Sequence, residues 1–107
     1  MGTILYAAAV GDYVVYTCNV PAAGRYDIKV AAKNFPIRGQ WQLSIDGTNQ
    51  GSPQVEYAPV ETWAEFDLGT ATITSPGLKS FKFTVVGKNE QSTGYRIAFD
   101  YVELTPQ

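Results

Sequence analysis

The chain contains no histidine and only one cysteine, Cys18, among its 107 residues. Without histidine there is no ordinary Ser-His-Asp triad, no histidine zinc site and no imidazole base for a cysteine nucleophile. A single cysteine excludes an intrachain disulfide, so cysteine pairing says nothing about the redox compartment. Alternation places Cys18 on the same side as Val14 and Val20, which predicts a small buried hydrophobe rather than a reactive thiol.

Charged residues are also few. They make up 17% of the chain, the formal net charge is -2, and hydrophobic residues make up 45%. These values are typical of a globular domain whose surface consists largely of uncharged polar groups. The sequence has no basic stripe that could neutralise phosphates, so nucleic acid and anionic membranes are poor partners. A neutral, hydroxyl-rich ligand suits such a surface.

No run of 18 apolar residues occurs, and this excludes an ordinary membrane-spanning helix. Met1-Gly2-Thr3 is not a basic start followed by an apolar stretch, so we expect no intact signal peptide there. Two alternatives remain, a cytoplasmic protein or a piece of a larger secreted one. The length fits one domain over residues 1–107 with a single hydrophobic core.

Apolar and polar residues alternate along most of the chain, as half-buried β-strands require. We expect strands over residues 12–20, 26–32, 41–45, 64–73, 81–85 and 95–104. The turn at residues 21–24 predicts a hairpin between the first two, Asp46-Gly47 ends the third, and Gly69 marks a bulge in the fourth. Because no helical pattern intervenes, the prediction is an all-β, antiparallel two-sheet β-sandwich.

Four stretches together resemble the β-jelly-roll carbohydrate-binding modules of families 6 and 35 and their relatives. They are GDYVVYTCNVPAAGRYDIKV (11–30), QLSIDGTNQGSP (42–53), AEFDLGTATI (64–73) and VVGKNEQSTGYRIAFDYVELTP (85–106). A β-glucan-binding family such as family 81 suits the small size. The resemblance implies a jelly-roll, non-catalytic, extracellular module attached to a secreted polysaccharide-degrading enzyme, and we expect a monomer.

The resemblance also bears on calcium. Modules of these families usually begin with an acidic strand that helps to bind a structural Ca²⁺ ion, whereas residues 4–9 here are apolar. The terminal aspartate of the families matches Asp100. Burying a lone carboxylate is costly unless it is paired or coordinates a metal, so Asp100 is a candidate ligand. The other ligands would be carbonyls, waters or an acid such as Asp12. The alternative is an aspartate that is hydrogen-bonded to a turn.

A pyranose ring has C–H groups on its faces and hydroxyls at its rim, so it suits an exposed aromatic ring flanked by polar groups. Trp63 is the strongest candidate, because its parity is opposite to that of Ala64 and Phe66. The pattern predicts an outward ring beside Glu65; the alternative is a bulge or loop edge that turns the ring inward. Trp41 has the parity of the core, but it stands at a strand mouth where it could line the site.

Two placements of the sugar site remain open, a groove across an outward sheet face and a cleft at the loop edge. The face would carry Trp63, with Gln40 and Gln42 as amides that grip hydroxyls. The loop candidates are Tyr57, Tyr95 and, by resemblance, Asn89 or Gln91. We favour the face. The expected ligand is a β-glucan such as mixed-linkage glucan, xyloglucan or a cello-oligosaccharide, bound weakly through stacking and hydrogen bonds.

Two other functions compete with sugar binding. Glu65 and Asp67 lie two residues apart on one strand face, close enough for the carboxylate pair of a small glycosidase. However, no deep cleft is evident, and exposed acids on strands are usually solvated. A structural or adhesive β-sandwich would instead use an exposed Trp63 as an anchor for another protein. The sequence favours a non-catalytic sugar-binding module over both.

Overall fold

The structure is a computed structural model that describes residues 3–107. Met1 and Gly2, on which the signal-peptide expectation partly rests, lie outside the described residues. The described strands are β1 (Thr3–Leu5), β2 (Tyr13–Val20), β3 (Gly24–Asn34), β4 (Gln40–Ile45), β5 (Thr48–Val55), β6 (Thr62–Ile73), β7 (Gly77–Gly87), β8 (Ile97–Phe99) and β9 (Tyr101–Pro106). Residues 3–107 contain no helix, and so none that could cross a membrane.

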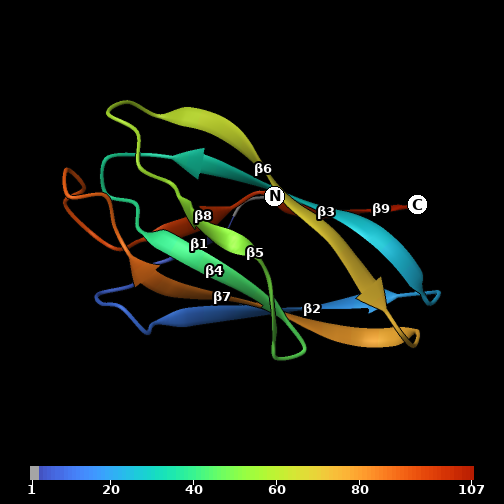
Figure 1. The fold of residues 1–107 in the computed structure, drawn as a ribbon. Coiled ribbons are helices and arrows are strands. Elements are labelled where there is room, and N and C mark those ends of the chain that lie inside the picture. Colours follow the sequence, from blue (N-terminus) through green and yellow to red (C-terminus); the bar gives the residue numbers. More distant parts are fainter. Residues whose placement is uncertain (1–2) are drawn as a thin grey trace.

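The strands form two antiparallel sheets that face each other, together with a short β1-β8 pair (Figure 1). One sheet has the order β2-β7-β4-β5 and the other has the order β6-β3-β9. Alternate residues of the inner strands are buried. In β4, for example, half-buried and fully buried residues alternate from Gln40 to Ile45. The predicted all-β two-sheet sandwich is therefore confirmed.

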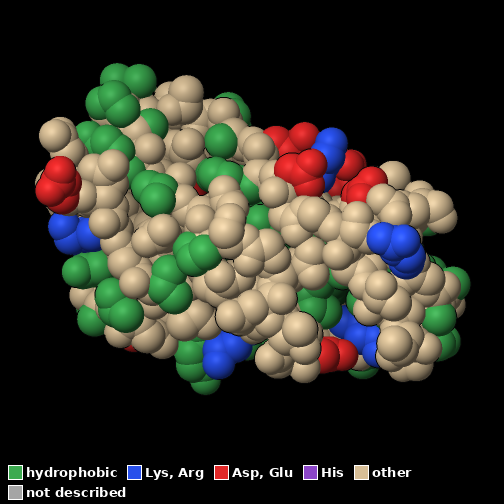
Figure 2. Space-filling model, in the orientation of Figure 1, with side chains coloured by type: hydrophobic (Ala, Val, Ile, Leu, Met, Phe, Trp, Pro, Cys, Tyr) green, Lys and Arg blue, Asp and Glu red, His purple; other side chains and the backbone are tan. Residues whose placement is uncertain are grey.

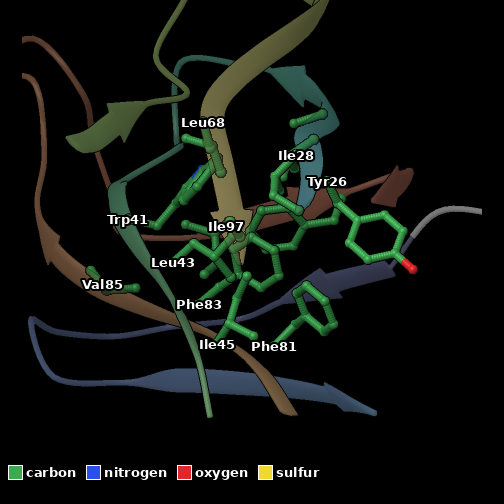
Figure 3. Packing of buried hydrophobic residues seen from close by; sticks show 14 of the residues in the cluster. Tyr26, Ile28, Trp41, Leu43, Ile45, Leu68, Phe81, Phe83, Val85 and Ile97 are labelled. Atoms are coloured by element: carbon green, nitrogen blue, oxygen red, sulfur yellow. The ribbon is translucent and has the colours of Figure 1, made fainter. Parts of the chain in front are cut away.

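Large apolar side chains from both sheets meet between them (Figure 3). Trp41 is fully buried, and its ring centroid lies 5.5, 5.1 and 5.4 Å from those of Phe66, Phe83 and Phe99 in edge-to-face geometry. Full burial of one large apolar side chain stabilises a fold by roughly 1.5–3 kcal/mol, and edge-to-face ring contacts add to this. The core therefore holds the two sheets in a fixed relation and leaves their outer faces for other roles.

The turn at residues 21–24 does not close a hairpin, so that prediction is wrong. β2 pairs with β7, whereas β3 pairs with β6 and β9, and the chain therefore crosses from one sheet to the other at this turn. The hydroxyl of Tyr26 donates a hydrogen bond of 2.5 Å to the carbonyl of Ala22 and fastens the crossing. Alternation indicates which side chains face the core, but it does not indicate which strand supplies the hydrogen bonds.

Residues 48–55 form β5, a strand that is not among those predicted from alternation. This strand contains Gly51 and Pro53, which are unusual within a sheet. Proline is tolerated here because β5 is an edge strand that pairs with β4 alone. Its register against β4 shifts between Trp41 and Leu43, so the polar segment bulges as it pairs.

The predicted last strand, residues 95–104, is two strands. β8 pairs with β1, and β9 pairs with β3 in the three-stranded sheet. Asp100 lies at the break, and its backbone N–H donates a hydrogen bond of 2.8 Å to the carbonyl of Ala31. The chain therefore changes partner at Asp100 and delivers Tyr101 to the edge of the three-stranded sheet.

The bulge predicted at Gly69 is confirmed. The β3-β6 register passes from Lys29 opposite Asp67 to Asp27 opposite Thr70, and Gly69 takes a φ of 78° that favours glycine. The predicted burial of Cys18 is wrong, because its side chain is exposed. Near Cys18 the edges of the two sheets separate around a hollow of about 550 Å³. Cys18 is therefore exposed, although alternation places its side chain on the inward side of the strand.

Candidate functional site

Trp63 lies on the outer face of the three-stranded sheet, and 64% of its surface is exposed, which confirms the predicted outward ring. Its register partner on the central strand β3 is Lys33. The ammonium nitrogen of Lys33 lies 5.3 Å from the centroid of the Trp63 ring and 3.0 Å from a carboxylate oxygen of Glu61. This cation–π contact and ion pair hold the ring on the sheet while leaving most of it in water.

A shallow hollow of about 340 Å³ lies beside the Trp63 ring. It is lined by Ala31, Trp63, Ala64, Glu65, Asp100 and Tyr101. Ala31 is on β3, and its register partners are Glu65 on β6 and Tyr101 on β9. The short alanine side chain leaves a depression between these longer neighbours. Two aromatic residues, Trp63 and the 46% exposed Tyr101, therefore line one depression from opposite edge strands.

Two neighbours position the carboxylate of Glu65. The hydroxyl of Tyr101 donates to its Oε2 at 3.3 Å, and the ammonium nitrogen of Lys29 lies 3.7 Å from its Oε1. The negative charge of Glu65 raises the pKa of Tyr101, and Glu103 and Asp100 contribute less to this rise. Tyr101 therefore keeps its proton at neutral pH, so the hollow combines a phenol donor with a carboxylate acceptor.

Sequence analysis did not single out Tyr101 as a site residue. It lies two residues before Glu103 on β9, and both side chains are exposed while Val102 and Leu104 are half-buried. The same alternation that identified Trp63 would have identified Tyr101. What the sequence does not contain is the pairing of β9 and β6 with opposite sides of β3, which brings Tyr101 to Glu65.

Gln42 does not lie near Trp63, and this part of the expectation is wrong. Gln40 and Gln42 alternate with the buried Trp41 on β4, so they face outward from the four-stranded sheet, on the other side of the sandwich. The amide nitrogen of Gln42 donates to the carbonyls of Leu43, Gln50 and Gly51 at 2.8, 3.3 and 3.1 Å. Its amide therefore satisfies backbone carbonyls at the β4-β5 bulge.

Trp41 is fully buried and cannot line an open site. It is a core residue, as its parity predicted. Its indole N–H donates a hydrogen bond of 2.6 Å to Oε2 of Glu56, a residue that sequence analysis did not single out. Oε1 of Glu56 accepts the backbone N–H of Ala98 at 3.0 Å and lies 3.8 Å from the Arg38 guanidinium. The buried carboxyl group of Glu56 thus connects β4, β8 and the chain that follows β5.

Burial raises the pKa of Glu56 from 4.5 to about 8, although the two hydrogen bonds and Arg38 oppose this rise. Burial also lowers the pKa of Arg38, against the attraction of Glu56. This cluster has no exposed face, because both side chains are buried. The connections at residues 35–39, 56–61 and 88–96 form the loop end of the sandwich. The role of the Glu56–Arg38 cluster is to join this loop end to the core rather than to contact a ligand.

The remaining candidates lie at the loop end of the sandwich (Figure 1). Tyr57 forms a β-bridge with Phe35, and the Tyr95 ring has the Lys88 ammonium 5.9 Å from its centroid. Oδ1 of Asn89 accepts the backbone N–H of Gln91 at 2.8 Å and so shapes its own loop. None of the four predicted loop residues lines the Trp63 hollow. The structure therefore separates the two placements and puts Trp63 and Glu65 together on the sheet face.

Asp100 does not belong to a cluster of acidic side chains among the described residues. Within residues 3–107, no three acidic, cysteine or histidine side chains come together in a group that could hold a metal ion. Oδ2 of Asp12 instead accepts the backbone N–H groups of Ala8 and Ala9 at 2.8 and 3.3 Å, and Asp100 lines the Trp63 hollow. Calcium takes six to eight oxygen ligands, so the other ligands of an ion at Asp100 would have to be backbone carbonyls or waters. Calcium binding at Asp100 stays a prediction.

The two facing sheets and their topology define this chain as a β-jelly-roll sandwich of the type found in carbohydrate-binding modules. No protein-family model and no curated protein matches it. Among solved structures, a Paenibacillus xanthan lyase is 36% identical over 97% of this chain, with a TM-score of 0.90. The matched region is 10% of the lyase chain, so this chain spans about a tenth of that protein.

Two further solved structures share the fold. The CBM36-1 domain of a multidomain xylanase from the hindgut metagenome of Trinervitermes trinervoides is 21% identical, with a TM-score of 0.64, over 97% of this chain and 77% of that domain. The Podospora anserina GH26-CBM35 β-(1,4)-mannanase is 13% identical, with a TM-score of 0.63, over 99% of this chain and 24% of the mannanase. The predicted resemblance to jelly-roll carbohydrate-binding modules is confirmed at the level of the fold.

Proposed function

We propose that this chain is a non-catalytic carbohydrate-binding module that binds a β-glucan-type polysaccharide at the Trp63 hollow. The observation that carries the proposal is the exposure of Trp63, 64%, at the edge of a hollow on an outer sheet face. The role that this exposed ring suits is contact with an apolar face of a ligand, because it stands beside polar groups in one hollow. Stacking against a sugar ring supplies that role.

The chemistry of the hollow suits a pyranose. The C–H face of a sugar packs on the Trp63 ring, and its rim hydroxyls meet the carboxylate of Glu65 and the phenol of Tyr101. Each such hydrogen bond contributes about 1 kcal/mol net, because both groups exchange a water partner for each other. The hollow is shallow and holds few polar groups, so we expect weak binding, with a dissociation constant of about 1 μM or higher.

The comparisons support attachment to a larger enzyme. The three proteins described above are named for polysaccharides, namely a xanthan lyase, a xylanase and a mannanase, and in the lyase and the mannanase the matched region is a minor part of the chain. By analogy, this domain would hold an attached catalytic domain close to an extracellular polysaccharide. We propose that the module acts as a monomer in this role.

The carboxylate pair suits binding better than glycoside hydrolysis. Glu65 is held by Lys29 and Tyr101, and Oδ1 of Asp67 accepts the backbone N–H of Gly69 at 3.0 Å within the bulge. Hydrolysis requires two carboxyl groups on either side of a glycosidic bond, one of them as a proton donor. Here both acids lie on an open sheet face, and the hydrogen bond from Gly69 fixes the orientation of Asp67 as an acceptor.

The test is affinity electrophoresis in native gels that contain mixed-linkage β-glucan, xyloglucan or hydroxyethyl cellulose. The wild-type chain should be retarded by at least one of them, and Trp63→Ala should lose about tenfold or more in affinity, since 1.4 kcal/mol of lost stacking corresponds to tenfold. Tyr13→Ala is the matched control. Tyr13 is 55% exposed with the Lys82 ammonium 4.2 Å from its ring centroid, but it lies on the other sheet.

Equal losses in both variants would show that the Trp63 hollow is not the site. Absence of retardation across a wide panel of plant and microbial glycans would remove the carbohydrate proposal. Release of reducing sugar by the isolated domain would favour a glycosidase instead. Circular dichroism of each variant checks that the fold is intact, because both substituted side chains are exposed and should not affect the core.

A further inference from the structure

The hollow beside Trp63 lies in a negatively charged part of the sheet face. Figure 2 shows acidic side chains gathered over β3 and β6 with a basic group among them. The acids of this face are Asp27, Glu61, Glu65, Asp67, Asp100 and Glu103, and its basic residues are Arg25, Lys29 and Lys33. Carboxylates therefore outnumber ammonium groups around the hollow.

The two lysines do not line the hollow. Lys33 is held by Glu61 at 3.0 Å and by the Trp63 ring, and Lys29 is 3.7 Å from Glu65. The charged side chains that line the hollow itself are Glu65 and Asp100. A ligand in the hollow thus contacts the lining residue Glu65, while the Lys29 ammonium lies 3.7 Å from the Glu65 carboxylate.

The negative charges around the hollow also act on Tyr101, which lines it. Its pKa is raised first of all by the charge of Glu65, with further contributions from Glu103 and Asp100. The atoms that make a phenolate anion unfavourable at this position would act in the same way on a carboxylate group of a bound sugar.

We infer that the Trp63 hollow selects uncharged sugar chains against carboxylated ones, and that Glu65 is the specificity-determining residue. This inference rests on the proposed function of the same site. Neutral hydroxyls can donate to the Glu65 carboxylate, which Tyr101 and Lys29 hold in place, at no electrostatic cost. A uronate or carboxymethyl group in the hollow is repelled by it instead. One carboxylate brought to roughly 4 Å from another in water weakens binding by about fivefold.

Hydroxyethyl cellulose and carboxymethyl cellulose of matched length test this inference, because they share a β-1,4-glucan backbone and differ in charge. Binding is measured by isothermal titration calorimetry at low salt and at 0.5 M NaCl. We expect the wild-type chain to bind carboxymethyl cellulose about fivefold or more weakly at low salt, and the difference to shrink at high salt because ions screen the repulsion. Equal or tighter binding of carboxymethyl cellulose at low salt would overturn the inference and leave the proposed function standing.

Two variants show whether the discrimination arises at Glu65. Glu65→Gln keeps the size of the side chain and an acceptor for Tyr101, and it should narrow the gap between the two polymers about fivefold. Glu90→Gln removes the same charge from a side chain outside the hollow and should leave the gap unchanged. The same change in both variants would assign the effect to net charge and overturn the role of Glu65. If neither polymer binds, the β-glucan proposal itself is wrong, and the inference falls with it.

Discussion

Glu56 should make the stability of this domain depend on pH in the direction opposite to that of a salt-bridged surface acid. Burial raises its pKa from 4.5 to about 8 in the folded protein. Between these values the folded chain holds a proton that the unfolded chain has released. The stabilising contribution is therefore complete below pH 4.5 and is lost as the pH rises through about 8.

The magnitude follows from proton linkage. At about 1.4 kcal/mol per pH unit, a pKa that rises from 4.5 to about 8 corresponds to about 5 kcal/mol in total. The part that falls between pH 5 and pH 8 is about 3.5 kcal/mol. In a domain of 107 residues, roughly 4 °C of thermal midpoint accompanies each kcal/mol, so Glu56 alone should lower the midpoint by about 15 °C over this range.

The assay is thermal unfolding followed by circular dichroism from pH 5 to pH 8 at constant ionic strength. Glu56→Gln keeps the size of the side chain and removes the titrating group, so its midpoint should change far less with pH than that of the wild type. Glu61→Gln, an exposed acid on the same connection, is the control and should keep the wild-type slope. Parallel profiles for wild type and Glu56→Gln would refute the reasoning.

Three further outcomes are expected. Gly51→Ala should destabilise the fold by about 1–3 kcal/mol in urea titrations, because the new Cβ would lie 3.1 Å from Leu68 atoms at a φ of 71°; an unchanged midpoint would contradict this. The exposed Cys18 should react with a thiol reagent in the native protein, and labelling that requires denaturant would show it to be buried. If Asp100 binds a structural Ca²⁺ ion, excess chelator should lower the thermal midpoint, and an unchanged midpoint would exclude the ion.

The fold was predictable from alternation where alternation is regular. Within the predicted strands, alternation puts Ile28, Leu43 and Phe83 on the core side, and each is fully buried. Alternation does not predict which strands pair with each other, because a strand has the same period of two whichever strand lies beside it. The supposed hairpin at residues 21–24 and the undivided strand at 95–104 are both errors of this kind. The polar edge strand β5 gives little alternation and was missed.

Alternation likewise predicted which side chains of the candidate site point outward, but not which strands bring them together. Parity alone predicted the exposed ring of Trp63 with Glu65 beside it. Parity also predicted that Gln42 faces outward, but it contains no information on which of two sheets a strand joins, so the amide was assigned to the wrong side. The hydrogen bond between Tyr101 and Glu65 joins residues that are 36 positions apart and depends on the complete sheet. A contact of this kind requires knowledge of the topology.

The strand order also determines when this hollow can form during folding. Within residues 3–107, β4 and β5 are the only paired strands that follow each other along the chain, while β1-β8, β2-β7, β3-β6 and β3-β9 join distant segments. Such nonlocal pairing makes folding slow, on the order of milliseconds to seconds. β9 carries Tyr101 and completes the sheet next to β3. In a ribosome-bound chain, the side of the hollow that Tyr101 lines could therefore not form until β9 had emerged. Ligand binding would therefore report completion of the whole domain.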